Sequence, residues 1–316
     1  MKSKKRRLTG MSGFKIAFPF LLPSLVGFVI FRFVPIIVSA AISFTNWDGV
    51  HELSLFSKPI SFMQEWGVGL DNYSQILTTS DFWRVLWHNI YFILLYLPLV
   101  LVMSLAVAMV LNRKCKGIGI YRVLYYIPVL TSWVAGSLIW KWVLSPEYGM
   151  INEILGVLGI TGPGWLQSEV WAMPAVVMAS VWKDMGYFGL IFLGGLQGID
   201  PTYYEASNID GASKWKQLRK ITLPLLSPTT FLVIITAIIN SFQLFTQIMI
   251  MTANSSGVVG GPNGATQVMV ERIYTYAFNY QQMGYASAYS WVLFVIILIF
   301  TVIQMKGQKR WVHYDA

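Results

Sequence analysis

Long apolar segments alternate with shorter polar ones along the whole chain. Each apolar segment reaches the ~20 residues that an α-helix needs to cross ~30 Å of hydrocarbon at about 1.5 Å per residue. The pattern predicts an all-α integral membrane protein with six transmembrane helices, over residues 16–44, 90–111, 123–144, 170–196, 226–246 and 286–305. Prolines inside these segments are tolerated, because neighbouring helices re-satisfy the backbone groups that proline frees.

The composition and the start of the chain support this prediction. Of the 316 residues, 55% are apolar and 12% are charged, whereas soluble domains carry about 25% charged residues. A basic segment, residues 1–15, precedes an apolar run, as in a signal peptide. The run 16–44 is too long for a signal peptide and has no small-residue cleavage pattern at its end. We therefore expect it to be retained as the first membrane helix.

Basic side chains mark one side of the membrane. Most of the 23 Lys and Arg residues fall in residues 1–15, 112–122, 197–225 and 306–316. These are the two ends of the chain and alternate loops, which the positive-inside rule places in the cytoplasm. We expect a multi-pass membrane domain, residues 16–305, between a basic cytoplasmic N-terminus and a short cytoplasmic tail, residues 306–316.

The cytoplasmic loop 200–224 is the most informative segment of the chain. Asp200 followed by Pro201 is typical of a helix start, and Gly211 is typical of a helix end in the left-handed conformation. Ser213 can begin a second helix. Apolar residues recur every three positions, at Ile209, Ala212, Trp215, Leu218 and Ile221. The loop is therefore predicted to form a short, stiff, amphipathic helical hairpin.

Within this hairpin, Glu205-Ala206, four further residues and Gly211, followed by Ile221-x-Leu223-Pro224, resemble the EAA loop of binding-protein-dependent ABC importer permeases. In that family the loop forms a coupling helix that docks into a groove on the ATPase subunit. The resemblance implies a coupling role for Glu205, Ala206, Ser207, Asp210, Gly211, Ala212, Ile221, Leu223 and Pro224. The third motif position, commonly alanine, is Ser207 here. The alternative is an ordinary amphipathic loop whose lysines and arginines bind lipid headgroups.

Other segments extend the resemblance to the multi-sugar and glycerol-phosphate branch of these permeases. They include Leu193-Gly194-Gly195-Leu196-Gln197, Gly260-Gly261-Pro262 and Met283-Gly284-Tyr285-Ala286. The resemblance implies a six-helix, type I importer permease in a bacterial cytoplasmic (inner) membrane. It also implies a related second permease subunit as heterodimer partner, two ATP-binding subunits, an extracytoplasmic solute-binding protein and a carbohydrate, a sugar or oligosaccharide, as substrate.

Several chemical functions have no sequence support. No G-x-x-x-x-G-K-[ST] phosphate loop, nucleophile triad or metal-ligand cluster occurs, and no nucleic-acid partner is indicated. His51, His88 and His313 are scattered, and Cys115 alone makes neither an internal disulfide nor a metal cluster. We therefore expect a transport subunit rather than an enzyme, with no catalytic residue, metal or cofactor on this chain. ATP and Mg are expected on the partner subunits.

Polar residues inside two predicted helices are candidates for a substrate path. Thr236, Asn240, Gln243 and Gln247 step by four, three and four along the fifth helix, so they share one face. Uncharged hydrogen-bonding groups suit sugar hydroxyls, although helix–helix hydrogen bonding explains such a stripe as well. The fourth helix holds Trp182, Lys183, Asp184 and Tyr187. Its charges either face a water-filled path or pair with neighbours, and Trp182 either stacks on a sugar ring or packs between helices.

The sequence leaves two other functions open, a secondary transporter and a non-transport membrane scaffold. A secondary transporter driven by an ion gradient would need an intramembrane carboxylate relay or inverted repeats, and Asp184 is the only carboxylate inside a predicted helix. A non-transport membrane scaffold would have no ATPase partner.

Overall fold

The computed structural model describes residues 11–113, 116–254, 257 and 259–312. Cys115, His313 and the basic residues 1–7 lie outside this part. The described part is helical, and its β-structure is a single antiparallel bridge between Thr45 and Gly67. The chain divides into two compact units, one with residues 11–75 and 276–291, the other with residues 76–275 and 292–312. Each unit is described by itself.

The first unit begins with one long, apolar helical segment, α1 (Met11–Phe28), η1 (Val29–Phe33) and α2 (Val34–Ile42). The wide π turn of η1, closed by the Val34 N–H on the Val29 carbonyl, precedes Pro35. Two short helices follow, α3 (Pro59–Trp66) and α4 (Asp71–Thr78). The start of α16 (Met283–Gln308) approaches the loop after α2 very closely, because the Gly284 N–H donates to the Trp47 carbonyl at 2.8 Å.

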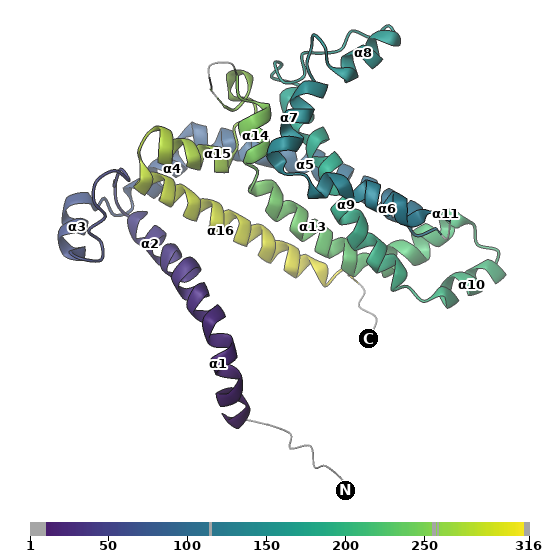
Figure 1. The fold of residues 1–316 in the computed structure, drawn as a ribbon, viewed down its shortest axis with the longest axis horizontal. Helices are drawn as coiled ribbons and strands as arrows, with labels where there is room; N and C mark the ends of the chain where they lie inside the picture. The colour runs from purple at the N-terminus through teal and green to yellow at the C-terminus, as the bar shows by residue number, and fades with distance from the viewer. Residues whose placement is uncertain (1–10, 114–115, 255–256, 258, 313–316) are drawn as a thin grey trace. The chain divides into compact units, whose positions relative to one another are not determined.

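The second unit is a helical bundle built around α5 (Ser80–Leu111), α9 (Ala172–Gln197) and α13 (Ser227–Phe242). In Figure 1, α5, α9 and α13 lie side by side, and contacts between residues of all three pairs confirm it. The connecting helices are α6 (Ile118–Leu130), α7 (Trp133–Val143), α8 (Met150–Val157), α10 (Pro201–Ile209), α11 (Lys214–Gln217), α12 (Leu223–Leu225), α14 (Thr246–Met251) and α15 (Met269–Tyr274). Gly186 lets α6 and α9 touch, since a Cβ there would lie 2.2 Å from the Tyr125 carbonyl oxygen.

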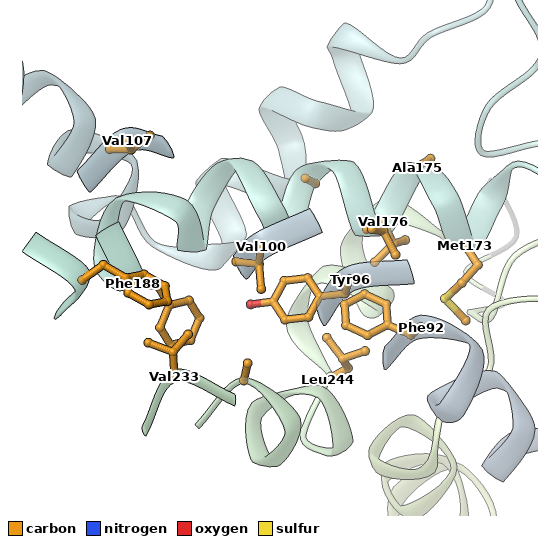
Figure 2. Close-up of a cluster of buried hydrophobic side chains, with 14 of the residues drawn as sticks. Phe92, Tyr96, Val100, Val107, Met173, Ala175, Val176, Phe188, Val233 and Leu244 are labelled. Atoms are coloured by element: carbon orange, nitrogen blue, oxygen red, sulfur yellow. The ribbon is translucent and has the colours of Figure 1, made fainter. Parts of the chain in front are cut away.

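The core of this bundle is aromatic and aliphatic. Figure 2 shows Phe92 and Tyr96 of α5 side by side, between Val176 of α9 and Leu244. The two rings stack with their centroids 5.1 Å apart, and both side chains are almost fully buried. Such close packing fixes α5 against α9.

The number of spans agrees with the prediction of six when each bent helix pair counts as one. Four helical segments of the described chain are long and apolar enough to cross a membrane alone. The predicted third helix, residues 123–144, is not continuous, because α6 and α7 meet at 97°. The predicted fifth helix, residues 226–246, ends earlier than expected, at Phe242. It follows a 67° bend near Leu226, where Pro224 and Pro228 interrupt the helical hydrogen bonding.

The short helix that precedes the last span packs against α5. It forms α15 and the π turn η4 (Thr275–Asn279), and α15 lies against α5. The Met269 N–H donates to the Asn89 side chain at 3.0 Å, and Val268 and Met269 are fully buried. Arg272 pairs with Asp81 at 3.0 Å. The start of this helix therefore belongs to the core of the second unit.

Glu271 is a buried carboxylate in this contact, with 2% of its surface exposed. Its Oε1 accepts a hydrogen bond from Thr275 at 2.8 Å, whereas its Oε2 has no hydrogen-bond partner among the described residues. Burial raises the pKa of Glu271, and the Thr275 hydrogen bond and the charge of Arg272 offset this only in part.

We expect Glu271→Gln to stabilise the purified protein at pH 8 and to change its stability little near pH 4.5. A carboxyl whose pKa is higher in the folded than in the unfolded state binds more protons when folded, so stability falls as pH rises between the two values. The measurement is the apparent unfolding temperature in detergent as a function of pH. Glu153→Gln on α8, at an exposed position, is the control and should be silent. A gain that does not depend on pH would contradict this assignment.

Candidate functional site

The hairpin after α9 begins with a well-defined helix start. Asp200 caps α10 by accepting a hydrogen bond from the Thr202 N–H at 2.8 Å and another from the Thr202 hydroxyl. These hydrogen bonds hold the pKa of Asp200 below its ordinary value. Pro201 occupies the first helical position, where a missing N–H costs nothing. The helix start therefore forms as the sequence predicts.

Gly211 ends α10 in the left-handed conformation that the sequence predicts, with φ +71°. The Ala212 N–H reaches back to the Ser207 carbonyl at 2.9 Å and the Gly211 N–H to the Asn208 carbonyl at 3.1 Å. This pair of bonds is a Schellman motif, which satisfies carbonyls that a helix end leaves open. Ser213 then starts α11 by accepting a hydrogen bond from the Lys216 N–H at 3.3 Å. The chain reverses within four residues.

Side-chain hydrogen bonds hold the two arms of the hairpin together. The amide of Gln217, which is 4% exposed, donates to Ser207 Oγ at 2.9 Å and to Asn208 Oδ1 at 2.6 Å. The Tyr204 and Thr222 hydroxyls are 3.0 Å apart and share a hydrogen bond. Ser207, the departure from the commonest motif residue, is thus a bonding partner that alanine could not replace. Gln217, Tyr204 and Thr222 were not singled out from the sequence, because their pairing depends on the fold of the turn.

The hairpin presents an apolar surface that nothing in the described chain covers. Ile209 is 87% exposed and Trp215 is 71% exposed, whereas Ala212, Leu218 and Ile221 are half-buried. The predicted five-residue apolar face is therefore divided between the inner side of the hairpin and its outer surface. Of the predicted coupling residues, Glu205, Ala206, Asp210, Gly211 and Leu223 are exposed, Ala212, Ile221 and Pro224 are half-buried, and Ser207 is buried.

The hairpin continues directly into a membrane helix. After α11 the chain passes through the π turn η2 (Leu218–Thr222) and α12 into α13, without an intervening flexible loop. In Figure 1, α10 and α11 lie together at one end of α9. The hairpin and α13 are therefore joined by a short connection of η2 and α12.

A polar cavity of about 280 Å³ lies farther along α13. Helices α5, α7, α9, α13 and α14 supply its walls, and it opens on the surface of the bundle, where Asn240 and Gln243 are exposed. Its lining residues are Phe92, Tyr96, Trp133, Ser180, Asp184, Asn240, Ser241, Gln243, Leu244, Phe245, Thr246 and Gln247. The walls combine aromatic faces with amide, hydroxyl and carboxylate groups, which is the usual composition of a small-molecule site.

Three residues of the predicted stripe, Asn240, Gln243 and Gln247, line this cavity. They do so on a broken helix, since α13 ends at Phe242 and α14 begins at Thr246. Thr236 does not line the cavity, and its hydroxyl donates to the Leu232 carbonyl at 2.8 Å inside its own helix. The break was not predicted, because no proline or glycine marks it.

The two charges at the centre of α9 have different surroundings. Asp184 faces the cavity and accepts a hydrogen bond from the Tyr96 hydroxyl at 2.6 Å. Lys183 points elsewhere, towards the end of α6, where its ammonium donates to the carbonyls of Pro128 at 2.8 Å and Thr131 at 2.5 Å. The remaining candidates on α9 do not line the cavity. Trp182 packs edge-on against Trp140, and Tyr187 is 42% exposed.

Lys183 thus satisfies the backbone where the third span breaks. The last carbonyls of a helix have no partner within it, and in hydrocarbon no water replaces one. Lys141 has a similar place at the end of α14, donating to the Ala253 carbonyl at 3.0 Å. Of the alternatives left open by the sequence, pairing with neighbouring groups is the one that the structure shows for Lys183.

Comparisons with known proteins agree with this architecture. Residues 76–311 match the model of the family described as binding-protein-dependent transport system inner membrane component. The chain is 35% identical to the probable ABC transporter permease protein YesP of Bacillus subtilis, over 100% of this chain and 96% of that protein. It is 32% identical to the trehalose/maltose transport system permease protein MalF of Thermococcus litoralis, over 92% and 93%.

Among solved structures, the fold is similar to that in the crystal structure of a bacterial ABC transporter involved in the import of the acidic polysaccharide alginate. The TM-score is 0.77 at 20% sequence identity, over 94% of this chain and 96% of that one. This likeness shows that the helical architecture is shared.

We expect Lys183→Met to lower the stability of the protein by about 2 kcal/mol, because buried carbonyls lose their donor. The apparent unfolding temperature in detergent measures the loss. Lys183→Arg, which keeps the charge and donors, should lose less. Tyr187→Phe, one turn away on the exposed side of α9, is the matched control and should unfold as the unaltered chain does. Equal stability of Lys183→Met and the control would rule out the capping role.

Proposed function

This chain belongs to the family of binding-protein-dependent transport system inner membrane components, and from that premise we propose that it forms one side of a carbohydrate path in an ATP-driven importer. Membership makes it the permease subunit of an ABC importer, a transport subunit rather than an enzyme. The carbohydrate is supported by the cavity, whose amides and hydroxyls can replace the water around sugar hydroxyls. The maltose- and alginate-related proteins named above point the same way.

The proposed assembly has three kinds of protein partner. An extracytoplasmic solute-binding protein delivers the carbohydrate, and a second, related permease completes the path as a heterodimer with this chain. Two ATP-binding subunits dock on the cytoplasmic side and hold ATP and Mg, since this sequence has no phosphate loop of its own. The basic loops support a topology with residues 1–15 and 306–316 in the cytoplasm, on either side of the membrane domain 16–305.

One observation carries the proposed mechanism, namely the short, bent helical connection from the hairpin through α12 to α13. The apolar surface with Ile209 and Trp215 belongs to a hairpin that is stiffened by the Gln217 hydrogen bonds. The same segment continues through α12 into α13, whose far end supplies Asn240 to the cavity. ATP-driven closure of the ATPases moves the hairpin, the hairpin moves α13, and the cavity changes the side to which it opens.

The hairpin surface is tested by Ile209→Asp, which puts a charge where the proposed ATPase contact is apolar. Because the side chain is 87% exposed, the fold should be unaffected. Central apolar residues of an interface contribute about 2 kcal/mol or more, so we expect roughly 30-fold weaker association with the ATP-binding subunits. The measurement is co-purification of these subunits together with uptake of the carbohydrate.

Val157→Asp is the matched control for this experiment. Val157 is 89% exposed on α8, which the proposed topology places outside the cell, so ATPase association should be retained. Wild-type levels of both association and uptake in Ile209→Asp would exclude the hairpin as the docking surface.

The cavity is tested by the double variant Asn240→Leu and Gln243→Leu. Each amide contributes hydrogen bonds of about 0.5–1.5 kcal/mol, so we expect uptake to fall roughly tenfold while the ATP-binding subunits still co-purify. Thr236→Val on the same helix removes a hydroxyl that bonds only within α13, and it should transport normally. If the double variant transports as well as Thr236→Val, these amides are not part of the path.

A further inference from the structure

The wall of the cavity beside α9 carries one charge. Among the described residues that line it, Asp184 is the only one with a charged side chain at neutral pH. Its Oδ2 accepts the hydrogen bond of the Tyr96 hydroxyl at 2.6 Å, whereas its Oδ1 accepts no hydrogen bond from a described residue. Both oxygens of an ionised carboxylate are acceptors. One of them is therefore left without a protein donor in a cavity that a solute can enter.

The neighbouring cation is not available to such a solute. Lys183 is the adjacent residue, but its ammonium donates to three carbonyl oxygens, those of Pro128 at 2.8 Å, Val129 at 3.4 Å and Thr131 at 2.5 Å. An ammonium has three hydrogens, so the backbone takes all of them. Among the described residues, no lysine, arginine or histidine lines the cavity. An anionic solute would find no free cation on this wall.

A lone carboxylate distinguishes between classes of carbohydrate. A sugar hydroxyl can donate to it, and hydrogen bonds to a charged acceptor are about twice as strong as neutral ones. The carboxylate, sulfate or phosphate of an acidic sugar brings acceptors and a like charge instead, and like charges placed together are unfavourable. The other polar groups of the wall, such as the amides of Asn240 and Gln243, carry no charge that would offset this repulsion. An unpaired charge that rejects a competitor is a common device of specificity.

We propose that Asp184 sets the charge class of the cargo, so that the path admits neutral and amino sugars and excludes acidic ones. This inference rests on the proposed function, because it requires that the carbohydrate pass through this cavity. The shared fold leaves the charge of the cargo open, since the similar solved structure belongs to an importer of an acidic polysaccharide. The charge class of this path therefore follows from the side chains that line it, one carboxylate and no cation.

Charged thiol reagents measure the field in the cavity without knowledge of the natural sugar. Asn240→Cys places a thiol on the exposed part of the wall, and Cys115→Ser removes the one native thiol of this chain. The complete transporter in detergent is treated with a cationic or an anionic methanethiosulfonate of similar size, and the mass of this chain reports the two rates. A carboxylate about 6 Å away changes the ratio of these rates about tenfold, even at the dielectric constant of water.

We expect Asp184→Asn to lower the cation-to-anion ratio of rates about tenfold and Asp184→Glu to keep it. Comparing variants at one cysteine cancels the intrinsic difference between the two reagents. Glu153→Gln, which removes an exposed carboxylate on α8, is the matched control and should leave the ratio unchanged. Equal rates with an uncharged methanethiosulfonate verify that each variant keeps the cavity. A ratio that Asp184→Asn does not change would overturn the proposal, and this includes the case of a cation supplied by the second permease.

Uptake separates this proposal from the proposed function. Proteoliposomes that contain the complete transporter and its solute-binding protein are offered a mixture of neutral, amino and uronic-acid oligosaccharides, and mass spectrometry identifies what enters. We expect neutral or amino sugars inside and no uronic acid. Import of a uronic-acid oligosaccharide would overturn the charge selectivity and leave the carbohydrate path intact. If no oligosaccharide enters while the ratio of thiol rates still depends on Asp184, the carbohydrate of the proposed function fails and the exclusion of anions stands.

Discussion

The structure depends on one constraint, that backbone carbonyls freed inside a membrane must find a donor within the protein. The bundle has broken helices at the walls of its cavity, α6–α7 and α13–α14. The break between α6 and α7 exposes carbonyls, and Lys183 of the neighbouring α9 donates to those of Pro128 and Thr131. A charged side chain inside the bundle thus supplies the donor that this broken span requires.

Hydrogen bonds rather than apolar packing also hold the hairpin in shape. The hairpin has little apolar core, so hydrogen bonds supply its stiffness, with Gln217 bridging to Ser207 and Asn208 and Tyr204 to Thr222. Because those bonds lie inside the hairpin, Ile209 and Trp215 remain available outside it. The ATPase contact that we propose would therefore use side chains that the hairpin's own fold does not need.

Much of this was predictable from the sequence, and the parts that were not have a common cause. The helical class and the family, indicated by Glu205-Ala206 with Gly211, are confirmed, as are the local signals at Asp200, Gly211 and Ser213. These depend on residues close together in the chain. The helix break after Phe242, the hydrogen bond between Tyr96 and Asp184 and the capping by Lys183 depend on segments far apart in sequence. Hydropathy contains no information about such contacts.

Two charges placed in one apolar span show why a sequence motif alone does not assign a role. Lys183 and Asp184 are consecutive, yet about 100° of helix rotation separates a backbone cap from a cavity wall. In water both side chains would be solvated surface charges. In the apolar interior of the bundle each needs a specific compensating group, so finding that group identifies what the residue does: the carbonyls of Pro128 and Thr131 for Lys183, and the Tyr96 hydroxyl for Asp184.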